Sequence, residues 1–102
     1  MTDRLKGKVA FLAGATSGIG EACAEIFARE GAMVAIAGRR EPEGETIAAR
    51  IRAAGGQAIF LRTDVTESLQ VQQSIDAAVA KFDRLDILLN NAGGSTASMS
   101  AS

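Results

Sequence analysis

Blocks of apolar residues with two different periods alternate along the chain and predict alternating strands and helices. Continuous apolar runs are typical of buried strands in a parallel sheet, whereas apolar residues at steps of three and four indicate amphipathic helices. The expected strands are Val9 to Ala13, Met33 to Ala37, Ala58 to Arg62 and Ile87 to Leu89. The expected helices run from about Ile19 to Glu30, from Pro42 to Gly55-Gly56, and from near Thr66 through Phe82.

Individual residues support these helices. Gly31 is the expected stop of the first helix, and Pro42 suits the first turn of the second because its φ is fixed. Ile47 and Ile51 give the second helix a narrow apolar stripe. The apolar face of the third helix is the most regular and consists of Val71, Ile75, Ala78, Val79 and Phe82.

This element order predicts an α/β fold with a doubly wound parallel sheet. Right-handed crossovers place the first three strands outward in one direction and return the fourth to the other side of strand one. The resulting strand order is 3-2-1-4, a Rossmann-like but incomplete sheet. The reversal opens a ligand crevice at the carboxyl end of strand one.

The glycine-rich run that follows strand one fits a phosphate-binding turn. Glycine in the turn allows backbone angles that a side chain forbids, and the N–H groups and positive dipole end of the next helix face an anion. Hydroxyls in the run can cap the helix or donate to phosphate. An ordinary glycine-rich turn with a serine cap is the alternative. The candidate residues are Gly14, Thr16, Ser17, Gly18, Ile19 and Gly20.

The spacing of these glycines differs from the common G-x-G-x-x-G fingerprint, and no Gly-Lys-Ser/Thr triphosphate loop is present. It resembles the T-G-x-x-x-G-x-G motif of the short-chain dehydrogenase/reductase family, with Ala13 in place of threonine. Three further motifs follow in the family's order, and the resemblance covers residues 6–94. They are Gly38-Arg39-Arg40, Asp64-Val65 and Asn90-Asn91-Ala92-Gly93.

The resemblance implies a role for each of these motifs. It implies that the Asp64 carboxylate holds the adenine amino group, with the main chain of Val65 beside it, and that Asn91 contacts the cofactor ribose. A capping or solvated Asp64 is the alternative, although Thr66 is the better cap candidate. The asparagine pair could instead only shape a turn.

The second strand ends in residues that favour NADP over NAD. NAD enzymes commonly carry an acidic residue about 20 positions after the glycine loop, but that position is Gly38, followed by Arg39 and Arg40. A guanidinium can bind the 2′-phosphate through charge-assisted hydrogen bonds worth roughly 1.5–3 kcal/mol, which is about a tenfold to hundredfold preference. A pair of solvated arginines is the alternative. In the family, an arginine at the position of Arg39 also accompanies NADP.

Catalytic groups are not expected in this chain. The family resemblance implies a Tyr-x-x-x-Lys pair, a serine and a further asparagine beyond the fourth strand, but the 102 residues contain no tyrosine and no histidine. We therefore expect no catalytic residue, no metal site and no turnover by this chain alone. Residues 1–94 form the expected dinucleotide-binding portion, and residues 95–102 form a Ser/Ala-rich tail, either a flexible end or the start of a substrate-side helix.

Composition limits the remaining possibilities. A net charge of −1 gives no indication of a nucleic-acid surface, and the apolar run Ala32 to Ala37 is too short to cross a bilayer. The polar amino terminus and a single cysteine, Cys23, favour a cytoplasmic location. We expect Cys23 to pack in the core, on the inward helix face with Ile19, Ile26 and Phe27.

Two functional hypotheses follow. In the first, the chain is the NADP-binding portion of a short-chain oxidoreductase, and only a longer form binds a small-molecule carbonyl or alcohol substrate. In the second, it is a stand-alone nucleotide-binding or interaction module without turnover. In either case, we expect strand four to form an open apolar edge that promotes self-association or marginal folding.

Overall fold

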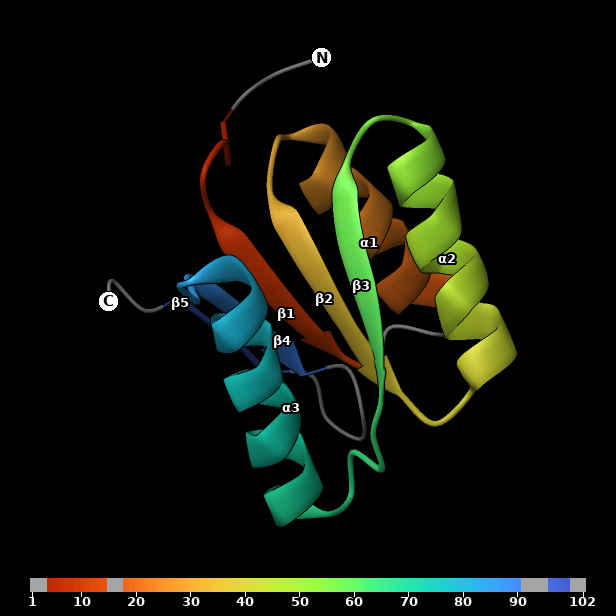
Figure 1. Ribbon diagram of the computed structural model, residues 1–102, viewed down its shortest axis with the longest axis vertical. Coiled ribbons are helices and arrows are strands. Elements are labelled where there is room, and N and C mark those ends of the chain that lie inside the picture. The colour runs from red at the N-terminus through yellow and green to blue at the C-terminus, as the bar shows by residue number, and fades with distance from the viewer. Residues whose placement is uncertain (1–3, 15–17, 91–95, 100–102) are drawn as a thin grey trace.

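A single sheet with helices on both faces forms the part of the chain that the computed structural model describes, residues 4–14, 18–90 and 96–99 (Figure 1). The strands are β1 (Val9–Ala13), β2 (Met33–Gly38), β3 (Gln57–Arg62), β4 (Ile87–Asn90) and β5 (Thr96–Met99). The helices are α1 (Gly18–Arg29), α2 (Glu41–Ala53) and α3 (Ser68–Phe82). The seven expected elements are thus present, with ends that differ by at most about two residues.

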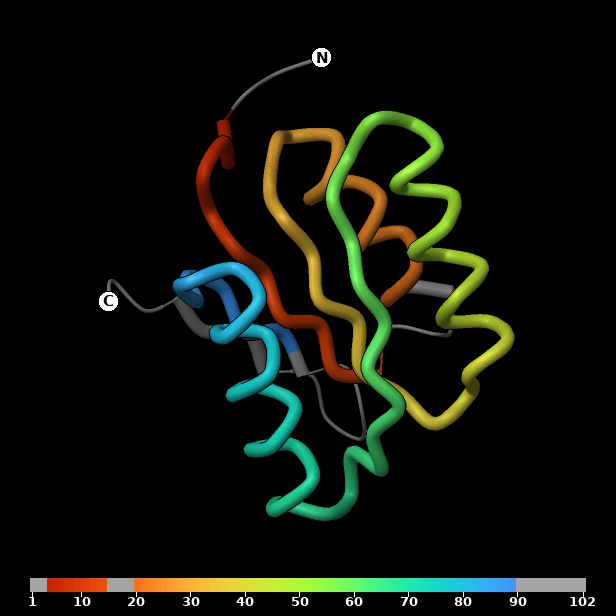
Figure 2. The backbone as a smooth tube through the Cα atoms, viewed as in Figure 1, coloured from red at the N-terminus to blue at the C-terminus, as the bar shows by residue number. Residues whose placement is uncertain are grey.

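The sheet has the order β3-β2-β1-β4-β5, and its first four strands are parallel. This confirms the expected order 3-2-1-4. The carboxyl ends of the strands are aligned, because Ala13 pairs with Ala37 on one side and with Asn90 on the other. The backbone trace shows β1, β2 and β3 side by side (Figure 2).

Both faces of β1 are buried, which explains its uninterrupted apolar sequence. Ala10 and Leu12 face a core that includes residues of α1 and α2. Val9, Phe11 and Ala13 face a second core closed by α3. Figure 1 shows α1 and α2 on one side of the sheet and α3 on the other.

The helix ends follow the expected chemistry in two cases and differ in one. Pro42 lies in the first turn of α2, and Gly31 after α1 has a φ of 103°, a left-handed value that favours glycine. Thr66, however, is not the cap of α3. The helix begins two residues later, with Glu67 at the N-cap position, and the Thr66 hydroxyl donates to Asp64 Oδ1 at 2.6 Å.

The amino ends of β1 and β4 are joined through Asp86, a buried carboxylate that is only 4% exposed. The Val9 N–H donates to Oδ2 at 2.9 Å, and the Asp86 N–H donates to the Val9 carbonyl at 2.9 Å. The Arg84 guanidinium donates to both carboxylate oxygens, at 2.8 and 2.6 Å. The pKa of Asp86 is lowered, above all by the hydrogen bond from Arg84.

The expectation that β4 forms an open edge is wrong. Residues Thr96–Met99, which we assigned to the tail, form β5 and pair antiparallel with β4 from Ile87↔Met99 to Asn90↔Thr96. Backbone pairing needs no particular side chains, so a Ser/Ala-rich segment can satisfy the hydrogen-bonding groups of a strand edge. The self-association that we inferred from an open β4 edge therefore loses its structural basis.

The inward face of α1 is rotated from the one we expected. Ala24 is fully buried, and Phe27 and Ala28 pack against the same core, whereas Ile26 is 50% exposed and Cys23 is half-buried. The side-chain direction turns by about 100° per residue around a helix. Ile26, two positions after Ala24, therefore points away from a face centred on Ala24. The side chain of Ile19 lies outside the described residues.

In the described part of the chain, no helix combines the length and the apolar character that a membrane span requires.

Candidate functional site

The polar positions that follow the parallel strands meet at one edge of the sheet. Gly14 follows β1, Arg39 follows β2, Asp64 lies two residues beyond β3, and β4 ends at Asn90. Because neighbouring strands are about 4.8 Å apart, these positions span about 14 Å from β3 to β4. The site is therefore an elongated edge rather than a closed cavity.

Of the turn after β1, the structure describes Gly14 and the start of the following helix at Gly18. Gly14 has a φ of 78°, which favours glycine, and α1 begins at Gly18. The first N–H groups of α1 have no acceptor within the helix, and its amino end faces the carboxyl edge of the sheet. Gly20 is buried in this first turn. Thr16 and Ser17 lie outside the described residues.

The end of β2 connects the turns on both sides of it. The Gly14 N–H donates to the Ala37 carbonyl at 2.7 Å, and the Thr63 N–H donates to the next carbonyl, that of Gly38, at 2.8 Å. Two consecutive carbonyls thus hold the glycine turn and the loop after β3. The positions of these two loops depend on the same short segment of backbone.

Two arginines follow this segment with their side chains exposed. Arg39 precedes α2 and Arg40 is its N-cap residue. Neither guanidinium forms a hydrogen bond or salt bridge with a described residue. Both are therefore available to an anionic ligand at this corner of the site.

Asp64 lies close enough to Arg39 to be influenced by its charge, and one of its carboxylate oxygens has no donor among the described residues. Its Oδ1 accepts the N–H of Thr66 at 3.1 Å and the hydroxyl of the same residue at 2.6 Å, whereas no described residue donates to Oδ2. The hydrogen bonds from Thr66 lower the pKa of Asp64, and the positive charge of Arg39 adds to the effect. The carboxylate is ionised at neutral pH, and its Oδ2 can accept further hydrogen bonds.

The side chain of Val65 points away from this acceptor and packs against the core under α3. The family resemblance implies that the main chain of Val65 borders the ligand, and this remains a prediction.

A pair of buried hydroxyls behind Asp64 was not among the expected site residues. Thr63 is 1% exposed and Ser74 is 8% exposed, and their oxygens are 2.5 Å apart. The available signal was a serine one position before Ile75, on a helix face that is otherwise apolar.

The fourth expected contact falls at the end of β4. Asn90 pairs with Ala13 of β1, so its backbone is level with the glycine turn. Asn91, which we expected to contact a ribose, lies outside the described residues.

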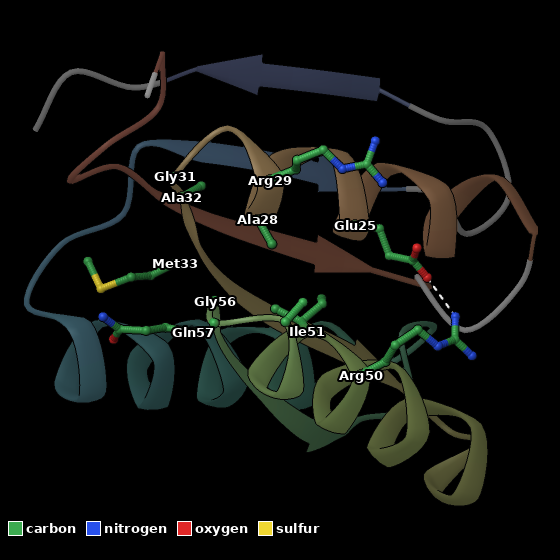
Figure 3. Close-up of a pocket in the computed structure, with 12 residues that line it drawn as sticks. Glu25, Ala28, Arg29, Gly31, Ala32, Met33, Arg50, Ile51, Gly56 and Gln57 are labelled. Carbon is green, nitrogen blue, oxygen red and sulfur yellow. Dashed lines mark hydrogen bonds and ion pairs between the residues drawn. The ribbon is translucent and has the colours of Figure 1, made fainter. Parts of the chain in front are cut away.

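A separate hollow of about 560 Å³ lies at the opposite edge of the sheet. Figure 3 shows Met33 and Gln57, at the starts of β2 and β3, at one end of the hollow. At its other end are Glu25 of α1 and Arg50 of α2, which form an ion pair of 2.6 Å. The carboxyl ends of α1 and α2 border this hollow, and their partial negative charge disfavours phosphate. The hollow is about 17 Å, one strand length, from the glycine turn.

Comparison with known proteins finds matches over almost the whole chain. The family model described as short chain dehydrogenase matches residues 8–102. Among curated proteins, 2,5-dichloro-2,5-cyclohexadiene-1,4-diol dehydrogenase of Sphingobium indicum is 47% identical over 93 residues, 91% of this chain and 37% of that protein. Tropinone reductase-like 2 of Erythroxylum coca is 43% identical over 90 residues, 88% of this chain and 32% of that protein.

Solved structures show the same fold. A hydroxysteroid dehydrogenase from Escherichia coli superposes with a TM-score of 0.85 at 38% identity, covering 89% of this chain and 39% of that one. A short-chain dehydrogenase/reductase from Serratia marcescens also gives a TM-score of 0.85, at 40% identity. The chain spans between 32% and 39% of the length of these relatives.

Proposed function

This chain belongs to the short-chain dehydrogenase family of oxidoreductases, and we propose that it forms the NADP(H)-binding part of an enzyme that acts on a carbonyl or alcohol substrate. Members of the family bind nicotinamide dinucleotides. The observation that carries the proposal is the alignment of four strand ends at one edge, level with the glycine turn and the amino end of α1.

The residues at this edge fit a dinucleotide in kind and in order. The free N–H groups of α1 suit the pyrophosphate, the Asp64 carboxylate suits the adenine amino group, and the end of β4 is left for the nicotinamide half. Thr16, Ser17 and Ile19 of the glycine turn and Asn91 after β4 complete the proposed set. Such a cofactor, when bound, gives or takes a hydride.

The preference for NADP over NAD rests on Arg39 and Arg40. Their guanidinium groups are exposed and have no salt-bridge partner among the described residues, so binding a 2′-phosphate would break no existing ion pair. No carboxylate occupies position 38, which is glycine, so the ribose site lacks the group that repels this phosphate. We therefore expect NADPH to bind about tenfold to hundredfold more tightly than NADH.

Calorimetric titration of the 102-residue chain with NADPH and with NADH tests this proposal. NADPH binding that is stronger than NADH binding supports it. Equal binding of the two would remove the NADP assignment, and no binding of either would remove the cofactor site itself. Salt at 0.5 M should weaken the difference, because exposed charges are screened.

A nucleotide-binding module without turnover is the second candidate, favoured by the absence of tyrosine from the sequence. We expect the chain to bind coenzyme but to oxidise no alcohol in its presence. NADPH formation from NADP by the purified chain with an added alcohol would contradict this. The mass of the natural protein would show whether a longer form carries the missing catalytic groups.

A further inference from the structure

We propose that Ser74 is a positioning residue for recognition of the adenine base: it holds Thr63 and, through Thr63, the Asp64 carboxylate. This inference rests on the proposed function, because it concerns how the site distinguishes one base from another. Ser74 lies on α3 and Asp64 in the loop after β3, so the pair links a helix of the core to the edge of the site.

The two hydroxyls form a chain of hydrogen bonds. A hydroxyl has one proton to donate, and Thr63 Oγ1 donates its proton to the Leu61 carbonyl at 2.9 Å. Either hydroxyl can donate in the 2.5 Å contact between the two oxygens, and Ser74 is the donor when Thr63 donates to Leu61. Both groups are buried, so the loss of one hydroxyl removes from the other a hydrogen bond that water does not readily replace, which costs free energy.

Thr63 is the residue through which this chain of bonds reaches the site. Its N–H donates to the Gly38 carbonyl, and its side chain is fixed by Ser74, so backbone and side chain are both held. The next residue, Asp64, donates its N–H to Gln70 Oε1 at 2.9 Å. Gln70 and Ser74 are four residues apart and lie on the same side of α3. Two points on one helix therefore fix the backbone that carries the carboxylate.

The accessible atom of that carboxylate can read the base. Thr66 occupies Oδ1, which leaves Oδ2 as the acceptor that faces a ligand. An ionised carboxylate only accepts hydrogen bonds. It therefore binds the amino group of adenine and repels the carbonyl oxygen that hypoxanthine has at the same ring position. Small displacements of Asp64 would weaken this discrimination more than they weaken overall binding.

The test compares the binding of NADPH with that of its hypoxanthine analogue. The analogue cannot donate the hydrogen bond from the adenine amino group to the Asp64 carboxylate. We therefore expect the unchanged chain to prefer NADPH over the analogue by about tenfold or more. In Ser74→Ala and Thr63→Val, the preference should fall to about threefold or less, while the analogue itself binds as before. Thr63→Ser keeps the hydroxyl and should retain the preference.

Two further variants control for folding and for hydroxyl loss in general. Thr46→Ala removes an exposed hydroxyl bonded to the Pro42 carbonyl in α2 and should leave the preference unchanged. Gln70 is exposed, so Gln70→Ala should fold normally and reduce the preference like Ser74→Ala. If circular dichroism shows that Ser74→Ala does not fold, the Gln70 variant decides.

The outcomes separate this inference from the proposed function. If Ser74→Ala and Gln70→Ala keep the full preference, or lose NADPH and the analogue to the same extent, Ser74 has only a structural role and the inference is wrong, although the cofactor site stands. If the unchanged chain binds neither compound, both the proposed function and the inference fall.

Discussion

At the scale of single residues, two carboxylates in the same fold have opposite relations to their surroundings. Asp86 uses both oxygens within the protein, for the Val9 N–H and the Arg84 guanidinium. Asp64 uses one and leaves the other accessible. The sequence motif predicted a role for Asp64, but Val9, which donates to Asp86, lies 77 residues away from it along the chain. Such long-range partners become visible only once the sheet is folded.

Asp86 should make stability depend on pH in the acidic range. Its pKa is lowered in the folded chain, so the unfolded chain takes up the proton at a higher pH. The stabilisation is then complete above the unfolded pKa of about 3.9 and is lost as pH falls through the folded value. Urea unfolding between pH 7 and pH 3 should show this decline.

Asp86→Ala should remove that part of the pH dependence and lower the free energy of unfolding at pH 7 by about 1–3 kcal/mol, because the buried Val9 N–H loses its side-chain acceptor. Asp76→Ala is the matched control, since Asp76 pairs only with exposed Gln72. An acid decline of the same size in both variants would show that other groups cause it.

Arg39→Ala should reduce the preference for NADPH over NADH by about tenfold or more, because one charge-assisted contact to the 2′-phosphate is lost. Binding of NADH should change little. Arg29→Ala removes an equally exposed guanidinium at the opposite edge of the sheet and serves as the control. The measurement is the ratio of the two dissociation constants in each variant, and an unchanged ratio in Arg39→Ala would remove this residue from the proposed site.

At the scale of elements, the sequence was a good guide wherever local chemistry determined the end of an element. The five residues of β1 were predicted without error, because a polar residue and a glycine bound a strictly apolar run. The start of α3 was missed, because the Thr66 side chain bonds backward to Asp64 rather than forward to the helix. β5 was missed because its pairing depends on β4 and not on its own residues.

The contact between α2 and β3 depends on the missing side chain at Gly44. A Cβ there would lie 2.1 Å from the Phe60 ring, so Gly44→Ala should destabilise the chain. Overpacking costs about 1–3 kcal/mol, and the better helix propensity of alanine recovers up to about 1 kcal/mol. With about 1 kcal/mol recovered, the expected net loss is up to about 2 kcal/mol, measured by urea unfolding.

A double-mutant cycle with Phe60→Leu tests the cause. If the ring is the obstacle, Gly44→Ala should cost less in the Phe60→Leu background than in the unchanged chain. Equal costs in both backgrounds would assign the loss to another neighbour of Gly44.

At the scale of the whole molecule, two hydrophobic cores share the strands β1 and β2. Ala10 and Leu12 contribute to one core and Phe11 to the other, so neither layer of helices can separate without exposing the same strands. The topology was predictable because crossovers have one hand. The accessible arginine pair at one corner could be anticipated from sequence, but the hydroxyl pair behind Asp64 could not, since its members lie on different elements.

Hydrogen exchange should reflect this arrangement. The amides of β1 and β2 have neighbouring strands on both sides and buried side chains, so we expect them to exchange most slowly, near the rate set by global unfolding. The amides in the first turn of α1 should be among the fastest, and saturating NADPH should slow them. Protection of α3 above that of β1 would contradict the shared-core description.

The two adjacent carbonyls at the end of β2 restrict how the chain could be redesigned to prefer the other coenzyme. Exchanging the side chains at positions 39 and 40 leaves the hydrogen bonds to the carbonyls of Ala37 and Gly38 intact. Inserting or deleting a residue before Ala37 would shift both the glycine turn after β1 and the loop after β3, because the two carbonyls hold these loops. Substitutions of the side chains at positions 39 and 40 are therefore expected to be tolerated here, whereas insertions and deletions are not.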